Sequence, residues 1–64
     1  MNREYDLFEN LPDGGRLWRA AIVGREAALA KLKALAAEST NQFFAMHLPT
    51  EEIVAKMQGA KKTP

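Results

Sequence analysis

The sequence predicts an α+β fold in which two β-hairpins bracket one helix, in the order ββαββ. Two corners carry this prediction, Leu11-Pro12-Asp13-Gly14 early in the chain and Leu48-Pro49-Thr50-Glu51 late, and strand-like residues flank each of them. Proline presets the backbone angle of the second residue of a turn, and Asp or Thr tolerates the next position. We therefore expect a four-stranded, mostly antiparallel sheet with the helix packed on one face.

The first hairpin is expected to have Pro12–Gly15 as its loop. Leu11 then faces Arg16, and apolar residues at alternate positions share one side of the sheet. A slip of one residue would move a strand's apolar set to the wrong face, which favours this register over a shorter loop. We expect Trp18 beneath the helix, near Leu32 or Leu35. The predicted core side consists of Tyr5, Leu7, Leu11, Trp18, Ala20 and Ile22.

The second hairpin is expected to have Pro49–Glu52 as its loop. This register also gives an unbroken apolar side, which should face the helix. The predicted pairs are Leu48 with Ile53, Met46 with Ala55 and Phe44 with Met57.

The segment Arg25–Glu38 is built almost wholly from strong helix formers, and Gly24 separates it from the preceding strand. Its apolar residues fall on one stripe, which should lie on the sheet. These residues are Ala28, Leu29, Leu32, Leu35 and Ala36. We favour the strand order 2-1-3-4, because a crossover that skips the first strand leaves all neighbouring strands antiparallel. The order 1-2-3-4 remains open.

Length and composition predict one small domain over residues 1–58, followed by a disordered basic tail over 59–64. A chain of 64 residues has a core that contributes only about 3–5 kcal/mol, so a dimer contact is a natural supplement. Cysteine is absent and His47 is the one histidine, so we expect no disulfide, metal or other cofactor. The charged start and the interrupted apolar runs predict a cytoplasmic protein without a membrane segment.

The whole pattern resembles a group of small bacterial proteins of unknown function. The residues that carry the resemblance are Tyr5-Asp6-Leu7-Phe8, Leu11-Pro12-Asp13-Gly14, Trp18, the Ala/Leu/Lys-rich helix and Phe43-Phe44-Ala45-Met46-His47-Leu48-Pro49-Thr50 with Ile53-Val54-Ala55-Lys56. The resemblance covers nearly the whole chain and implies a compact ββαββ unit. It implies no activity and no site residue.

The sheet face opposite the helix is the predicted functional surface, because the residues expected there are too apolar for a face that meets only water. The predicted interaction residues are Phe8, Leu17, Arg19, Phe43, His47 and Val54. Burying such a patch would also relieve the small core, and two-fold homodimers are the commonest assembly. We therefore expect a protein-interaction module that associates with itself through this face or through an edge strand. Single exposed apolar residues are nevertheless normal in proteins, so an unused surface remains open.

Nucleic-acid binding is the alternative function. Arg16, Arg19 and Lys56, with Lys61 and Lys62 of the tail, could contact phosphates. Phe8, Phe43 or Trp18 could provide a surface on which bases stack. A formal net charge of +1 and the acidic residues among these cations make this function the weaker alternative.

Catalysis is not expected. His47 is the candidate of most interest, with Val54 across the strand and Glu52 near the turn as predicted neighbours. A histidine paired with a carboxylate can act as a base, yet Ser39 and Thr40 belong to a separate loop. A lone histidine on a strand more often lies at a surface or an interface.

Overall fold

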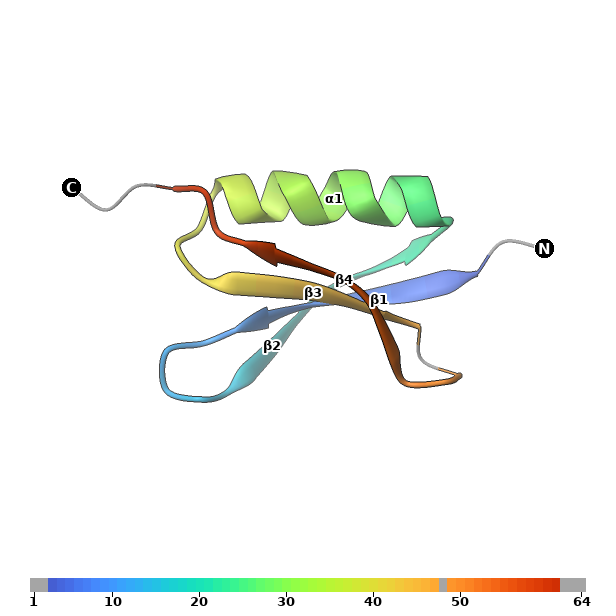
Figure 1. Ribbon diagram of the computed structural model, residues 1–64, viewed down its shortest axis with the longest axis horizontal. Helices are drawn as coiled ribbons and strands as arrows, with labels where there is room; N and C mark the ends of the chain where they lie inside the picture. The colour runs from blue at the N-terminus through green and yellow to red at the C-terminus, as the bar shows by residue number, and fades with distance from the viewer. Residues whose placement is uncertain (1–2, 48, 62–64) are drawn as a thin grey trace.

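The chain folds as two antiparallel hairpins joined by one helix, which confirms the predicted α+β class (Figure 1). The computed structural model describes residues 3–47 and 49–61. Figure 1 shows the helix lying along one face of a strongly twisted sheet. The elements are β1 (Glu4–Asn10), β2 (Arg16–Val23), α1 (Arg25–Ala37), β3 (Gln42–His47) and β4 (Glu52–Gln58).

The strand order is β2-β1-β3-β4, and every neighbouring pair is antiparallel, which confirms the favoured order. The segment that contains α1 carries the chain from β2 past β1 to β3. The two hairpins therefore meet along β1 and β3 in the middle of the sheet, and β2 and β4 form its edges.

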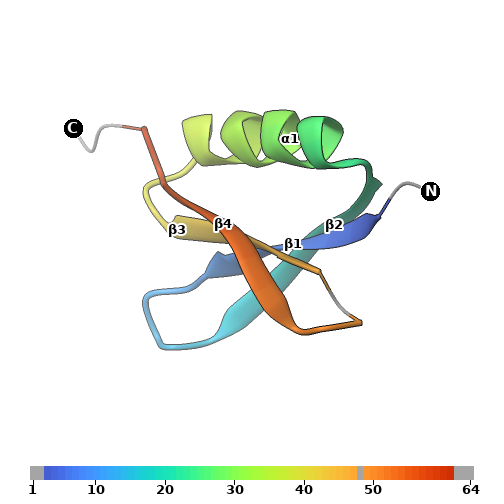
Figure 2. The ribbon, with the colours of Figure 1, turned by 45° about the vertical axis from the view of Figure 1, so that its right-hand side comes forward.

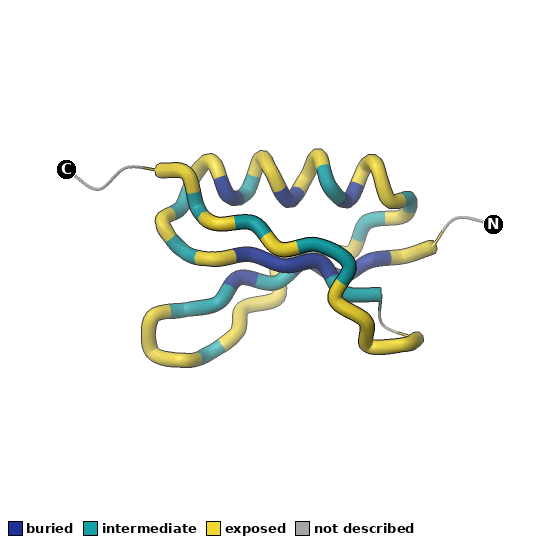
Figure 3. Tube along the Cα trace, in the orientation of Figure 1, coloured by how far each residue is buried: buried dark blue, intermediate teal, exposed yellow. Residues whose placement is uncertain are grey.

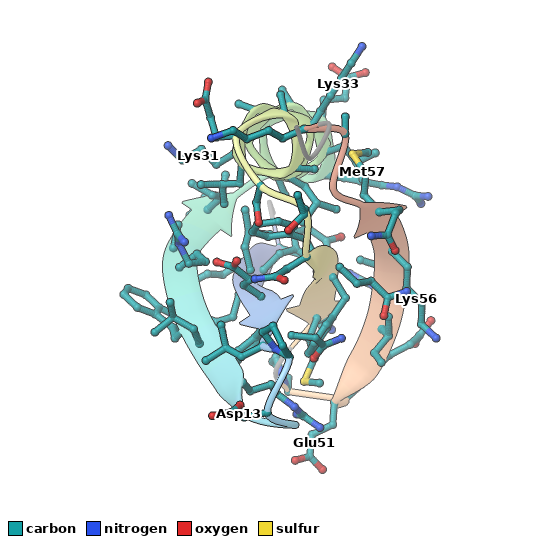
Figure 4. All side chains as sticks on the ribbon, turned by 90° about the vertical axis from the view of Figure 1, so that its left-hand side faces the viewer. Asp13, Lys31, Lys33, Glu51, Lys56 and Met57 are labelled. Atoms are coloured by element: carbon teal, nitrogen blue, oxygen red, sulfur yellow. The ribbon has the colours of Figure 1, made fainter. Side chains whose placement is uncertain are left out.

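The helix begins after Gly24, whose φ of +96° is a conformation that residues with a side chain rarely adopt. The Gly24 amide donates to the Arg3 carbonyl oxygen at 2.8 Å, which ties the start of α1 to the start of β1. The predicted stripe faces the sheet. Ala28, Leu32 and Ala36 are buried, whereas Lys31 and Lys33 extend away from the sheet (Figure 4).

The core is a single layer between α1 and the adjacent sheet face. Figure 3 shows the buried positions in the middle strands and on the underside of the helix. The largest fully buried side chains are Phe43, Leu7 and Leu32. The core cluster consists of Tyr5, Leu7, Ala28, Leu32, Ala36, Phe43 and Ala45.

The predicted register of the first hairpin is correct near the helix and wrong near the loop. Leu7 faces Ala20 as expected, but Arg16 pairs with Asn10 rather than with Leu11. The difference is a β-bulge at Leu7/Phe8, where the residue between Trp18 and Ala20 has no partner on β1. The bulge puts Trp18 opposite Phe8, so the prediction that Trp18 packs beneath the helix is wrong.

The second hairpin is shifted by one residue from the predicted register in its inner half. Phe43, and not Phe44, pairs with Met57. Because side chains alternate along a strand, this shift exchanges the faces of the two phenylalanines. A second bulge at Ala45/Met46 leaves Val54 as the extra residue of β4. Leu48, the predicted partner of Ile53, lies outside the described residues.

The bulges also shape the sheet. A bulge bends its strand and increases the local twist. Figures 1 and 2 show both hairpin turns displaced to the side of the sheet away from α1.

Residues 59–61 come after β4 and lie against the end of the helix. Their amides donate to the carbonyl oxygens of Asn41, Ala36 and Ser39 at 2.8, 2.8 and 3.1 Å. The first half of the predicted tail thus makes backbone hydrogen bonds to the end of α1 and the loop after it, and residues 62–64 lie outside the described part of the chain.

Candidate functional site

The sheet face opposite α1, called here the open face, carries a row of side chains that crosses all four strands. The register places Trp18 opposite Phe8, Phe8 opposite Phe44, and Phe44 opposite Lys56. Directly opposed residues of neighbouring strands have side chains on the same face. We call these four residues the central row. It contains three aromatic rings in succession and ends in a cation.

The middle of the central row is packed. The rings of Phe8 and Phe44 stack with their centroids 5.2 Å apart and an interplanar angle of 18°. The guanidinium carbon of Arg16 lies 5.4 Å from the centroid of the Phe44 ring. Phe44 is consequently only 4% exposed although it lies on the face without a helix. These contacts give the open face a small apolar centre of its own.

The β2 end of the row is exposed. Trp18 is 56% exposed, and its indole Nε1 donates to Oδ1 of Asp6 at 2.9 Å. This hydrogen bond satisfies the polar atom of the indole and holds the ring beside the strand. Ile53 lies on the same face by its pairing with Met46 and is 44% exposed. The open face thus combines a packed apolar centre with exposed apolar side chains on both edge strands.

The open face carries both basic and acidic side chains. Arg16 lies near the first hairpin turn, and Lys56 ends the central row. Glu4 lies at the opposite end of β1, where it pairs with Val23. Figure 4 shows Lys56 extending outward from β4, whereas the next residue, Met57, is directed toward α1. Asp6, which pairs with Ala21 and Met46, lies between Phe8 and Glu4 on the same face, so charged and apolar residues are interspersed along the strand direction.

The edges of the sheet are less regular than its middle. Each edge strand carries one of the two bulges, at Arg19 in β2 and at Val54 in β4. A bulge interrupts the regular spacing of backbone donors and acceptors that a further strand would need.

Of the six residues predicted to form the interaction surface, Phe8 lies on the open face and the other five lie on the helix side. Phe43 is 1% exposed in the core, which makes its predicted exposure wrong. Val54 packs against the core cluster, and the ring of His47 lies 5.7 Å from that of Tyr5. Leu17 is opposite Glu9 and is exposed at the edge of β2 on the helix side.

Arg19, the remaining predicted residue, points to the helix side because it is the bulged residue of β2. Its Nη1 donates to Oε1 of Glu9 at 2.6 Å. Oε2 of Glu9 accepts from Asn41 Nδ2 at 2.7 Å and from Ser39 Oγ at 3.1 Å. These hydrogen bonds, that of Asn41 first, and the charge of Arg19 outweigh burial and lower the pKa of Glu9 below its ordinary value. The cluster joins β1 and β2 to the loop between α1 and β3.

His47 does not pair with the predicted neighbour Val54. It pairs with Glu52 in the register, and its Nδ1 lies 3.1 Å from Thr50 Oγ1. Ser39 donates to Glu9 instead, so its hydroxyl belongs to the Glu9 cluster. Among the described residues, no group of three or more His, Cys, Asp or Glu side chains could hold a metal ion.

The residues that sequence reasoning missed are Phe44, Met46 and Ile53, together with Trp18 as an exposed residue. Phe43 and Phe44 are adjacent, so either register puts one ring on each face. One available signal was Asp6 two residues before Phe8, which supplies an acceptor for an indole on that face. The cations predicted for nucleic-acid binding are divided. Arg16 and Lys56 share the open face, Arg19 does not, and Lys62 lies outside the described residues.

Comparisons of the chain with protein-family models, with curated proteins and with solved structures found no match. Within the described residues, no helix combines the length and the apolar character needed to cross a membrane.

Proposed function

We propose that this chain is a non-enzymatic protein-interaction module that associates with itself through the open face. The observation that carries the proposal is the central row, in which a packed Phe8–Phe44 pair adjoins a tryptophan that is 56% exposed. Aromatic side chains around a packed centre are the usual anchors of protein interfaces. Covering them would remove apolar surface from water and stabilise a domain with a small core.

The open face is a better candidate than an edge strand. Edge-to-edge association requires regular backbone hydrogen bonding along β2 or β4, and a bulge interrupts each of these strands. Face-to-face packing depends on side chains and tolerates the bulges. Ile53 and Trp18 lie on opposite edges of this face and would both be covered.

The test uses Trp18 as the probe, since it is the sole tryptophan of the chain. Protein is diluted from about 1 mM to about 1 μM, a range that spans weak to moderate dimer affinities. We expect the tryptophan emission to move to longer wavelength on dilution as the indole returns to water, while sedimentation shows dimers dissociating to monomers.

Two equally exposed residues provide the matched variants. Ile53 and Leu17 are both 44% exposed, but Ile53 is on the open face and Leu17 is on the helix side of β2. Ile53→Lys should weaken association at least about tenfold by adding a desolvated charge, whereas Leu17→Lys should not. A wild-type protein that is monomeric at about 1 mM, with emission independent of concentration, would contradict the proposal.

Binding of single-stranded nucleic acid is the second candidate, and the position of Arg16 and Lys56 beside the aromatic rings favours it. Against it, Phe44 is almost fully buried and cannot stack on a base, and Asp6 and Glu4 share the face. Fluorescence anisotropy with single-stranded and duplex oligonucleotides at about 150 mM salt distinguishes the candidates. Submicromolar binding that is lost in Arg16→Glu/Lys56→Glu would favour nucleic acid over self-association.

A further inference from the structure

Strand β1 carries two carboxylates, Asp6 and Glu9, that are equally buried but lie on opposite faces of the sheet. Each residue is 6% exposed. On the helix side, Glu9 accepts hydrogen bonds from three side chains, which belong to β2 and to the loop after α1. On the open face, the donor that reaches Asp6 among the described residues is Trp18 Nε1, at 2.9 Å from Oδ1. Glu9 thus joins segments of the chain, whereas Asp6 holds a single exposed side chain.

Asp6 occupies a position that an apolar side chain would fill at less cost. Its direct neighbours across the strands are Ala21 and Met46, and Phe8 is the next residue of β1 on the same face. A carboxylate in such surroundings loses water, and one hydrogen bond from a neutral donor replaces only part of it. Replacement of a buried charge by an apolar residue is often neutral or stabilising. Residues that break a local rule in this way are typical of functional positions.

The side chain that Asp6 holds is the most exposed aromatic residue of the central row. Trp18 lies on the edge strand β2 and is 56% exposed. A side chain that becomes ordered only on binding adds an entropy cost to association. The hydrogen bond from Nε1 to Oδ1 selects one orientation of the ring before any partner arrives. It also engages the polar atom of the indole, so the ring surface that remains exposed is apolar.

We infer that Asp6 is a positioning residue that preorganises Trp18 as the anchor of the open face. This inference rests on the proposed self-association and names the residue that prepares its main contact. The ring is ordered when the chain folds, so association does not have to order it again. The buried carboxylate of the open face therefore acts on binding through the indole, and contributes less to the stability of the monomer than the Glu9 cluster does.

The test compares Asp6→Leu, which removes the acceptor, with Asp6→Asn, which keeps an acceptor oxygen. Trp18 is the sole tryptophan, so the fluorescence anisotropy of the chain at about 1 μM reports the mobility of this ring in the monomer. Asp6→Leu should lower the anisotropy and raise the dimer dissociation constant, measured by sedimentation, at least about fivefold, because the ordering cost arises in both copies. Asp6→Asn should keep the wild-type anisotropy and a dissociation constant within about threefold of wild type.

The same exchange in a Trp18→Phe background separates positioning from a general effect of the carboxylate. Phenylalanine has no N–H to donate, so Asp6→Leu should then change the dissociation constant by less than about twofold. Circular dichroism checks that every variant is folded. Asp6→Ala removes the acceptor without adding a branched side chain, and repeats the test if Asp6→Leu does not fold.

The outcomes separate this inference from the proposal on which it rests. Unchanged anisotropy in Asp6→Leu, or a mobile ring with an unchanged dissociation constant, would overturn the role of Asp6 and leave self-association standing. Equal weakening in the Trp18→Phe background would show that the carboxylate does not act through the indole, and would also overturn it. Unfolding of both Asp6→Leu and Asp6→Ala would assign the carboxylate to stability instead. A wild-type chain that stays monomeric would overturn both the inference and the proposed self-association.

Discussion

Glu9 ties three parts of the chain together although its carboxylate is almost fully buried. It accepts hydrogen bonds from Arg19 on β2 and from Ser39 and Asn41 in the loop after α1. A buried carboxylate is tolerated only when such donors replace the water it has lost. The cluster therefore joins the sheet to the loop where the helix finishes.

The Glu9 cluster makes stability depend on pH. The pKa of Glu9 is lowered in the folded chain, chiefly by the Asn41 hydrogen bond, so folding favours the ionised carboxylate. Its contribution is fully present above its ordinary pKa of 4.5 and is lost as pH falls through the lower folded value. We expect the urea concentration at the unfolding midpoint of wild type to decrease when the pH is below about 5, because this contribution is then lost.

Glu9→Gln should lower the free energy of unfolding by about 1–2 kcal/mol at pH 7. It should also reduce the decrease of the urea midpoint at acid pH. Gln can still accept a hydrogen bond, but its amide group meets Arg19 without a negative charge. Glu51→Gln, an exposed change in the second turn, is the control and should leave the midpoint at pH 7 near wild type. If the urea midpoint of Glu9→Gln decreased at acid pH as much as that of wild type, the Glu9 cluster would not be the cause of the pH dependence.

At the scale of elements, the end of β4 continues into a segment that holds the end of the helix. Gly59, Ala60 and Lys61 donate backbone hydrogen bonds to Asn41, Ala36 and Ser39. Ala36 ends the buried stripe of α1, and its carbonyl oxygen accepts from Ala60 at 2.8 Å and from Ser39 at 3.2 Å, so this segment adds a hydrogen bond at the end of the helix. The approach is close because Gly59 has no side chain.

Gly59→Ala tests this contact. A Cβ at position 59 would collide with the Ser39 carbonyl oxygen and lie 2.6 Å from that of Asn41, and backbone atoms cannot turn aside. We expect the segment to detach, with a loss of about 1–3 kcal/mol in the free energy of unfolding and of amide exchange protection at residues 59–61.

Gly24→Ala is the comparison for that variant. The φ of +96° at Gly24 strains any residue with a side chain, but no atom lies within 4 Å of the added Cβ. This variant should lose stability through backbone strain, by about 1–3 kcal/mol, while residues 59–61 keep their protection. Retained protection in Gly59→Ala would contradict the close contact.

For the whole molecule, the small core makes stability depend on very few side chains. Phe43, Leu7 and Leu32 are its largest fully buried members, and they lie between one helix and one sheet face. A core of this size contributes only about 3–5 kcal/mol, so the loss of one large member approaches the total.

Phe43→Ala should therefore cost about 3–5 kcal/mol and leave the chain largely unfolded. Trp18→Ala should remain folded, since Trp18 is 56% exposed and lies on the open face. Far-ultraviolet circular dichroism at low micromolar concentration measures both variants without a contribution from association. A folded Phe43→Ala together with an unfolded Trp18→Ala would reverse the assignment of the two sheet faces.

The amino-acid sequence by itself determined the elements and their order. Local signals act within a few residues: the two Leu-Pro corners mark the turns, and the apolar stripe from Ala28 to Ala36 marks the buried side of the helix. A general rule on crossovers favoured the strand order that the structure has, but left the order 1-2-3-4 open.

Only the tertiary structure decided which residues line each face of the sheet. Phe43 and Phe44 are adjacent, so the apolar pattern alone fits either register. The choice depends on distant contacts: the helix covers Phe43, while Phe8 stacks on Phe44. In the first hairpin a bulge turns Arg19 toward Glu9 and moves Trp18 to the open face. A rule that gathers apolar residues on one side cannot anticipate a buried carboxylate, because the donors that stabilise it come from another part of the chain.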